Sequence, residues 1–315
     1  MRLVTSSVEH PSVLETFKQL EKAGFTVTYL PVDARGIVSL RDLQDVLSPD
    51  EAVFVSVMHV NNETGSIQPI YEIASLVRRV AMQSLFHVDA VQSFGKLPEP
   101  IIPDDPDLSP DLITLSGHKI HGPKGVGALY VAPNAPIGPI VYGGGQEYGM
   151  RSGTENIPAI TGFGIAAKAS ASDLKEAYRH VGEVKAAFLK ELENGWERPL
   201  KWTLNGEPPS SGRFSHYILN VGFPGLSGES IVHHLEARGV YVSTQSACSS
   251  RKPGPSHVLK AMGLDRETIE GSIRISFSRF TSVSDAVAAA KHLKEVVREL
   301  SELGGHRVFS ARSRR

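Results

Sequence analysis

The sequence predicts an α/β protein in which a largely parallel sheet is followed by a smaller α+β unit. Short apolar segments in the first half alternate with stretches of helical period. Several of these apolar segments end in polar residues, as the segment 52–58 does before His59. Alternation of this kind is typical of parallel sheets whose functional site lies at the carboxyl ends of the strands. After about residue 170 the pattern changes to long charged helices with fewer strands.

The first half contains clear signals for where helices begin and end. Pro11 suits the first position of a helix, Phe17 and Leu20 lie on its apolar face, and Gly24 ends it. The same criteria predict these strands and helices: strands 2–5, 25–30, 52–58, 85–88, 112–115 and 127–131, and helices 11–23, 40–47, 70–82 and 156–167.

The second half predicts a separate, smaller unit. Its expected elements are helices 173–194, 227–238, 257–262 and 283–300, with strands 215–222, 241–243 and 271–277. Ser227 is a suitable N-cap for the second of these helices. We therefore predict a large domain over 1–170 and a small domain over 171–303. The basic segment 304–315 lacks periodicity, and we predict that it is disordered.

Composition excludes several classes of protein. The 315 residues carry a net charge of −1, which gives no global field that would favour nucleic acid or an anionic membrane. No uninterrupted apolar segment reaches the ~18–20 residues of a membrane span. The single cysteine, Cys248, cannot form an intramolecular disulfide, and the cytoplasm is therefore the expected location.

The segment 112–127 contains the most informative residue of the chain. The apolar strand 112–115 ends in Ser116, Gly117, His118 and Lys119, and a Gly/Pro-rich turn follows. A lysine fixed at the end of a buried strand is suited to Schiff-base chemistry, because partial burial favours the nucleophilic neutral amine. The alternative from this window alone is a strand end whose lysine reaches out to solvent.

Asp89 follows the apolar strand 85–88, and Gln92 comes three residues later. A carboxylate at a strand end can hold a heteroaromatic N–H, or it can simply cap the helix that starts at Ala90. Together, Lys119 and Asp89 meet the two requirements of pyridoxal phosphate chemistry. These are a lysine that binds the cofactor and an acid that keeps the ring nitrogen protonated.

Two further residues stand out in the second half. Cys248 is surrounded by small polar residues, two cations and two prolines, which predicts an exposed loop with a reactive thiol. Arg274 lies within the strand-like segment 271–277 and is a candidate clamp for a carboxylate. The alternative for Arg274 is one outward arginine on an alternating strand. The glycine-rich loop 143–156 is either an anion cradle or a flexible connection.

Five motifs together resemble the cysteine desulfurases, which are fold-type-I pyridoxal phosphate enzymes of the class V aminotransferase superfamily. The resemblance runs in register from residue 2 to about residue 300. The loop that follows Cys248 resembles the long-loop, NifS/IscS-like branch. The motifs are Val60-Asn61-Asn62-Glu63-Thr64-Gly65, His87-Val88-Asp89-Ala90-Val91-Gln92, Ser116-Gly117-His118-Lys119, Gly149-Met150-Arg151-Ser152-Gly153-Thr154 and Ser246-Ala247-Cys248-Ser249-Ser250.

The resemblance implies roles around the cofactor ring. Lys119 would form the Schiff base with pyridoxal phosphate and carry protons. Asp89 would hold the pyridine nitrogen, and Gln92 would hold the phenolic oxygen. His10 would stack on the ring face and take part in catalysis, although the residues around it favour a plain helix-start residue.

The resemblance also implies contacts to phosphate and substrate. Ser116 and His118 would hold the phosphate, and Thr154 would reach the phosphate site of a partner subunit in a homodimer. Asn62, near the cofactor, and Arg274 would hold the carboxylate of L-cysteine.

The implied reaction converts L-cysteine to L-alanine, with Cys248 receiving the sulfur as a persulfide. The sulfur would pass to an acceptor protein, either an iron–sulfur scaffold or a tRNA-thiolation enzyme. Two alternatives remain open. One is a selenocysteine lyase or another class V lyase or aminotransferase, and the other is a cofactor-free binding subunit.

One departure from the family concerns the beginning of the chain. Members of the family begin roughly a hundred residues earlier, a span that approaches a small domain. In the family that segment carries a Gly-Ala-Thr-type loop that binds the phosphate, and this sequence contains no equivalent. We therefore expect a truncated large domain that binds the cofactor weakly or not at all.

Overall fold

The computed structural model describes residues 2–194, 196, 201–206, 212–244 and 254–303. A six-stranded sheet occupies the first part of the chain, in the order β2-β1-β3-β4-β5-β6. The first five strands along the chain are parallel, and β6 is antiparallel to β5. The fold class predicted from the sequence is therefore confirmed. The strands are β1 Arg2–Ser6, β2 Thr26–Leu30, β3 Val53–Met58, β4 Leu85–Asp89, β5 Leu112–Ser116 and β6 Gly127–Val131.

Amphipathic helices pack against this sheet. Helix α3 buries an apolar stripe that includes Ile73 and Val77, and this stripe packs with Val55, Phe86 and Val88 of the sheet. Helix α1 begins at Pro11, as predicted. The helices of this part are α1 Pro11–Lys22, α2 Leu40–Val46, α3 Ile70–Val80 and α4 Ile157–Ser172, with short 3₁₀ helices η1 Pro106–Leu108, η2 Gly117–Ile120 and η3 Glu147–Gly149.

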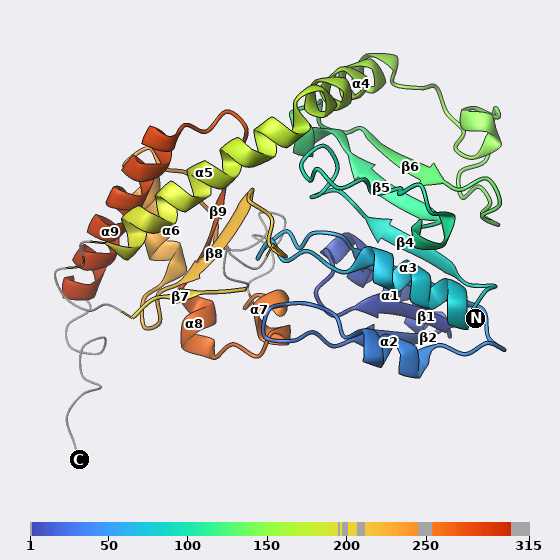
Figure 1. Cartoon of the computed structure of the whole chain (residues 1–315), viewed down its shortest axis with the longest axis horizontal. Coiled ribbons are helices and arrows are strands. Elements are labelled where there is room, and N and C mark those ends of the chain that lie inside the picture. Colours follow the sequence, from blue (N-terminus) through green and yellow to red (C-terminus); the bar gives the residue numbers. More distant parts are fainter. Residues whose placement is uncertain (1, 195, 197–200, 207–211, 245–253, 304–315) are drawn as a thin grey trace.

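A second, three-stranded antiparallel sheet has the order β7-β8-β9. Helices α4 and α5 follow one another and carry the chain from the large sheet to the small one (Figure 1). The core of this part lies between α5, α6, α9 and the strands β8 and β9. Its elements are α5 Leu174–Glu193, β7 Thr203–Leu204, β8 Ile218–Gly222, α6 Gly228–Glu236, α7 His257–Ala261, α8 Arg266–Glu270, β9 Ser272–Ser276 and α9 Val283–Leu303.

The predicted strand over Tyr241–Ser243 is wrong. The aromatic and β-branched residues there favoured a strand, but only Ser243 pairs with β9, through a single bridge to Arg274. Tyr241 is largely exposed, so its ring does not pack as a strand residue would. The predicted disordered tail, 304–315, lies outside the described residues.

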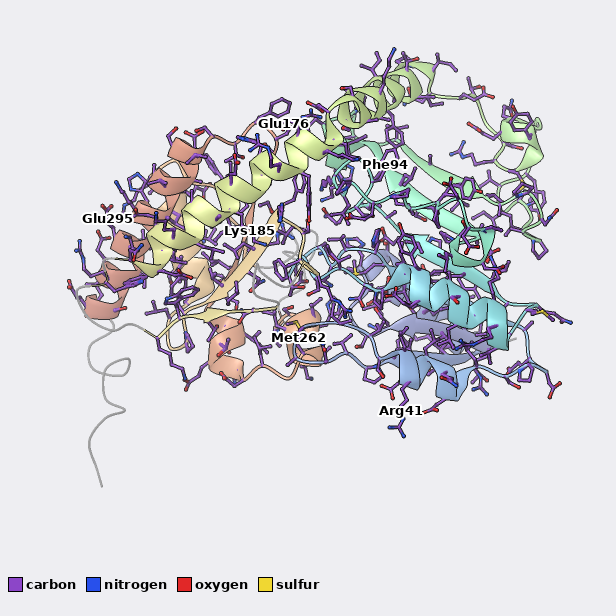
Figure 2. All side chains as sticks on the ribbon, viewed as in Figure 1. Arg41, Phe94, Glu176, Lys185, Met262 and Glu295 are labelled. Carbon is purple, nitrogen blue, oxygen red and sulfur yellow. The ribbon has the colours of Figure 1, made fainter. Side chains whose placement is uncertain are left out.

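A buried lysine attaches α5 to the small sheet. Lys185 lies on α5 (Figure 2). Its Nζ donates to the carbonyl oxygens of Ser215 and Ile218, each at 2.9 Å, and lies 3.9 Å from the centroid of the Phe214 ring. Burial lowers the pKa of Lys185. The amine therefore serves as a hydrogen-bond donor inside the protein rather than as a surface charge.

We expect Lys185→Met to lower the free energy of unfolding by about 2 kcal/mol, because two buried carbonyl groups lose their donor. Urea denaturation monitored by circular dichroism measures this change. Lys190→Met on the exposed face of the same helix is the control, with an expected change within about 0.5 kcal/mol. Equal effects of the two substitutions would contradict a structural role for Lys185.

Candidate active site

The candidate site lies where parallel strands of the large sheet end. Met58 pairs with Asp89, and Asp89 pairs with Thr114, so the ends of β3, β4 and β5 are aligned. Asp89 is the last residue of β4, and Lys119 lies three residues beyond the end of β5. This alignment brings the two predicted residues to the same edge of the sheet.

Asp89 is buried, with 7% of its surface exposed. Its Oδ1 accepts a hydrogen bond from the backbone N–H of Val91 at 3.0 Å, so it also caps the turn that follows β4. Burial raises the pKa of Asp89, while the Val91 N–H and the charges of His10 and Lys119 act in the opposite direction. A buried carboxyl near two basic groups is suited to hold a protonated ring nitrogen.

Lys119 lies in η2 and is half-buried. The turn around it closes through two backbone hydrogen bonds, from Gly117 N to Val126 O and from Gly122 N to Gly117 O. A Cβ atom at residue 122 would lie 2.9 Å from Gly117 O, so only glycine fits there. The Gly-rich sequence after Lys119 therefore allows the chain to fold back directly behind the amine.

His10 is the N-cap of α1, as the simpler interpretation of the sequence proposed. Its Nδ1 accepts from Ser12 N at 3.2 Å and lies 2.8 Å from Ser12 Oγ. Because Nδ1 is an acceptor, the neutral ring carries its hydrogen on Nε2. Burial lowers the pKa of His10, which favours this neutral form. The cap uses Nδ1 at the edge of the ring, so its hydrogen bonds do not involve the ring faces. Stacking of His10 on a cofactor remains a prediction.

The proposed phosphate ligands are only partly brought together. Ser116 Oγ and His118 Nδ1 lie 2.8 Å apart at the end of β5. His118 is exposed, so a ligand can reach it. Thr154 is exposed in the segment between η3 and α4, and no hydrogen bond joins it to this pair within the part of the chain that the structure describes. Its predicted role toward a partner subunit remains a prediction.

The two predicted substrate ligands meet across the boundary between the sheets. Arg274 Nη1, on β9, donates to the backbone oxygen of Asn62 at 3.0 Å, and Asn62 is itself buried. Asn220 on β8 donates to Glu63 O at 3.1 Å, and Ser256 Oγ lies 2.5 Å from Glu63 Oε2. The loop after β3 is thus attached to the small sheet at several points.

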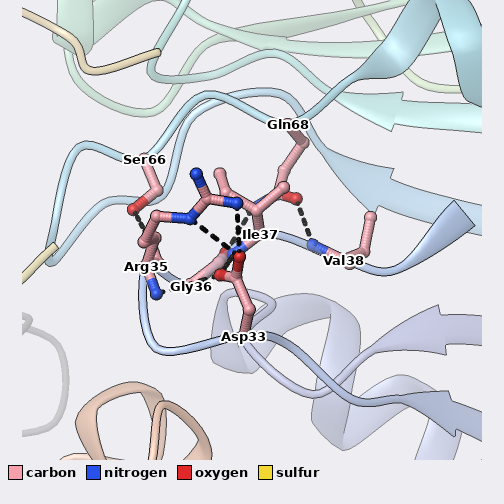
Figure 3. Close-up of polar contacts among 7 residues, drawn as sticks. All are labelled: Asp33, Arg35, Gly36, Ile37, Val38, Ser66 and Gln68. Atoms are coloured by element: carbon pink, nitrogen blue, oxygen red, sulfur yellow. Dashed lines mark hydrogen bonds and ion pairs between the residues drawn. The ribbon is translucent and has the colours of Figure 1, made fainter. Parts of the chain in front are cut away.

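Figure 3 shows why that loop has a fixed position. The Asp33 carboxylate accepts from the backbone N–H groups of Arg35 and Ile37 and from Arg35 Nε, which makes a tight turn. Ser66 Oγ donates to Arg35 O at 2.6 Å. Gln68 donates to Gly36 O and accepts from Val38 N. The residues that follow Asn62 are therefore tied to a second, well-bonded turn.

Cys248 lies outside the described residues, and its predicted role is not tested. On the N-terminal side of Cys248, the last described residue is Thr244. The residue before it, Ser243, forms a bridge with Arg274.

Two ionisable groups near the site, the buried Glu9 and the half-buried Lys96, did not emerge from the sequence. Lys96 follows Gln92 by four residues, a spacing that would have brought the side chains together on a helix, and it donates to Gln92 Oε1 at 2.9 Å. Glu9 precedes His10 in the sequence, and a charged residue just before a helix gives no sign of burial. Its burial becomes visible only in the fold.

Glu9 is completely buried at the end of β1. Its Oε1 accepts from Met58 N at 2.8 Å and from Ser6 Oγ at 2.5 Å, while Oε2 has no hydrogen-bond partner among the described residues. Burial raises the pKa of Glu9 to about 8. A charge on this carboxyl would be poorly compensated, so the neutral acid is favoured at neutral pH.

This pKa predicts a pH dependence of stability. Because the folded pKa of about 8 lies above the unfolded value, the folded state binds the extra proton between about pH 4.5 and 8. Stability should therefore fall as pH rises through this window. Glu9→Gln mimics the neutral acid, and thermal unfolding of this variant should show a flatter profile than wild type. Parallel profiles for the two proteins would contradict a raised pKa.

The donor set fits pyridoxal phosphate. It offers a primary amine for an aldehyde, a buried carboxyl for a ring nitrogen, an amide for a phenolic oxygen, and a hydroxyl–imidazole pair for a phosphate. Within the described chain, no group of three His, Cys, Asp or Glu residues is arranged to hold a metal ion. The described helices include none that is long and apolar enough to cross a membrane.

Comparison with known proteins agrees with this geometry. Residues 1–288 match the family model described as aminotransferase class-V. The chain is 40% identical over 301 residues to "Cysteine desulfurase IscS" from Methanosarcina thermophila, covering 96% of this chain and 71% of the relative. The chain belongs to the class-V aminotransferase family. The family resemblance identified from the sequence motifs is therefore confirmed.

Other known proteins are similar over most of the chain. "Cysteine desulfurase IscS" from Dictyoglomus turgidum is 39% identical and covers 97% of this chain and 74% of the relative. A solved structure named "NIFS-LIKE PROTEIN" has a TM-score of 0.84 and 36% identity, over 95% of this chain and 76% of that one. A NifS-like protein from Rickettsia africae has a TM-score of 0.81 and 29% identity, over 94% and 76%.

Proposed function

We propose that this chain is a pyridoxal phosphate-dependent cysteine desulfurase that converts L-cysteine to L-alanine and passes on the sulfur. The observation that carries the proposal is the pair of Lys119 and Asp89, which interact electrostatically at the ends of neighbouring parallel strands. Membership of the class-V family, with relatives named cysteine desulfurases at about 40% identity, supports it.

Pyridoxal phosphate, when bound, supplies an electron sink for a negative charge at the substrate Cα. In this proposal Lys119 attaches the cofactor and then moves a proton to and from that carbon. Asp89 keeps a proton on the ring nitrogen. Gln92 donates to the phenolic oxygen, and His10 covers one face of the ring.

The remaining residues would position phosphate and substrate. Ser116 and His118 hold the phosphate with their paired hydroxyl and imidazole. Arg274 and Asn62 hold the substrate carboxylate, where a guanidinium offers paired donors to a carboxylate. Cys248 accepts the sulfur as a persulfide. Arg274 forms a bridge with Ser243, which precedes Cys248 by five residues in the sequence, and this supports a substrate position beside Arg274.

We further propose that two copies of the chain form a homodimer in the cytoplasm, with a large domain over 1–170 and a small domain over 171–303. Large apolar side chains remain exposed from the segment after β6 to the first residue of α4, a distribution that supports contact with another protein surface. They include Ile140, Tyr142, Tyr148 and Ile157, which are 91%, 81%, 103% and 61% exposed. In this arrangement Thr154 would serve the partner's phosphate site, and an acceptor protein would collect the sulfur.

The test is to incubate the purified chain with pyridoxal phosphate and ³⁵S-labelled L-cysteine. Because the sequence predicts weak cofactor binding, the assay uses a large excess of pyridoxal phosphate. Under these conditions we expect alanine to form and the label to appear on Cys248 without reductant, and Cys248→Ala should lose the protein-bound label. Cofactor binding with turnover of L-selenocysteine but not L-cysteine would favour a selenocysteine lyase instead. A folded chain that binds no cofactor would favour a binding subunit.

A further inference from the structure

Lys96 is an ionisable group at the site that the proposed mechanism does not use. It lies in the turn between β4 and η1, is half-buried, and donates from Nζ to Gln92 Oε1 at 2.9 Å. The same Nζ lies 5.6 Å from the centroid of the Tyr217 ring, which belongs to the small-domain side of the molecule. The amine is therefore held between the turn that follows Asp89 and the segment that leads into β8 (Ile218–Gly222).

Gly95 explains why Lys96 lies so close to the Lys119 turn. Gly95 has φ +66°, and a Cβ atom there would lie 3.0 Å from Ile120 Cγ2 and 3.0 Å from Ser170 Cβ. The backbone at residue 95 thus packs directly on the residue that follows Lys119. Only glycine combines this φ with this contact, so the Gly95-Lys96 pair delivers an amine beside the site.

The contact to Gln92 determines which end of its amide is available. A primary amide has an acceptor oxygen at one end and a donor NH₂ group at the other. A lysine ammonium has donors only, so it binds the oxygen and leaves Nε2 for another partner. We propose that Lys96 is a positioning residue that holds Gln92 Oε1 so that Gln92 presents its Nε2 donor to the ligand at Lys119. This inference rests on the proposed function and adds a residue to it.

The charges around Lys96 are consistent with this role. Burial lowers the pKa of Lys96 to about 7, and the charges of Lys119 and Arg274 act in the same direction. An anionic ligand oxygen held by Gln92 would favour the ammonium form, which is the form that fixes the amide. The other titratable groups that interact with or lie beside this amine are His118, His121 and Tyr217.

The first test uses the cofactor-free chain and follows the side-chain amide of Gln92 by ¹⁵N NMR, with Gln92→Ala to assign the signal. In wild type we expect an ordered amide whose shift titrates with a midpoint near 7. In Lys96→Met the titration should vanish and the amide should become mobile, while Lys96→Arg should restore an ordered amide without that titration. An amide with the same order and titration in Lys96→Met would overturn the proposal.

The second test is a double-mutant cycle on pyridoxal phosphate affinity. In the wild-type background, we expect Lys96→Met to weaken pyridoxal phosphate binding about tenfold, which is the loss expected when a charge-assisted hydrogen bond is removed. In the Gln92→Ala background the same substitution should cost less than about twofold, because Lys96 acts through Gln92. Lys96→Arg should stay near wild type. Equal losses in both backgrounds would show that Lys96 acts on the ligand directly and would overturn the positioning role.

The two tests separate this inference from the proposed function. If no variant binds pyridoxal phosphate, the proposed function fails, whereas the amide measurement still decides whether Lys96 positions Gln92. Far-ultraviolet circular dichroism of each variant shows whether the fold is retained. Lys96→Arg keeps a long cationic side chain with donors and is the matched control for a general loss of packing.

Discussion

Lys119→Ala is expected to abolish stable attachment of pyridoxal phosphate and to reduce alanine formation by about 10²–10⁴-fold. The amine has two tasks in the proposed reaction, since it binds the cofactor aldehyde and moves the proton at Cα. Within the described chain, Lys119 is the lysine whose charge acts on the buried Asp89 carboxyl. Borohydride reduction followed by peptide mapping measures the attachment, and a coupled alanine assay measures the rate.

The control is Lys124→Ala, which removes an exposed lysine from the same Gly/Pro-rich segment. It should retain both the label and the activity. The alanine variant at 119 should fold, because backbone hydrogen bonds from Gly117 and Gly122 close the turn without the lysine side chain. Stoichiometric borohydride-stable label on another lysine in Lys119→Ala, or activity within tenfold of wild type, would contradict the assignment.

The sequence predicted the large sheet well because its parallel strands read as short apolar runs. Val53–Met58 and Leu112–Ser116 are examples, and both lie where expected. The two-residue strand Thr203–Leu204 has too few residues for any period to be visible. Tyr241–Ser243 had the composition of a strand, but its pairing is limited to one bridge, which depends on how the chain leaves α6.

The residues of the candidate site also divide into those that the local sequence predicts and those that it does not. Asp89 and Lys119 could be predicted because each directly follows an apolar strand, and aligned strands place their ends together. The contact from Arg274 to Asn62 joins residues 212 positions apart, so composition alone could not reveal it. The position of Lys96 depends on the positive φ of Gly95 and on the packing of Gly95 against Ile120. Such contacts follow from tertiary structure rather than from local pattern.

The loop between β3 and α3 links the site to both sheets. Its Asn62 carbonyl accepts from Arg274, and its Glu63 accepts from Asn220 on β8 and from Ser256, which precedes α7. A substrate carboxylate held by Arg274 and Asn62 would therefore bind at a junction whose geometry both sheets determine. In the proposed function, substrate positioning would depend on the packing of the small sheet as much as on the strand ends.

Asp89→Asn should produce opposite effects on stability and activity. Burial raises the pKa of Asp89 in the folded state, so the charged carboxylate is less favourable in the cofactor-free fold than in the unfolded chain. A buried charge that is kept for function lowers the stability of the fold, so removing the charge typically stabilises the protein. The amide oxygen of the substituted side chain can still accept from Val91 N–H, and the cofactor-free variant should therefore unfold at a higher temperature than wild type at neutral pH. Below the unfolded pKa of aspartate the difference should disappear, because both proteins are then neutral at this position.

Activity should change in the other direction. An asparagine cannot keep a proton on the ring nitrogen, so we expect alanine formation to fall by about 10²–10⁴-fold in the cofactor-saturated variant. Single-turnover assays measure this step separately from cofactor affinity. Asp111→Asn is unsuitable as a control, because Asp111 pairs with Arg78 at 2.6 Å. Asp107→Asn, at an exposed position, is the better match. If Asp89→Asn retains activity within threefold while its stability rises, the carboxyl is a buried structural acid, and the ring nitrogen must find its partner elsewhere in the site.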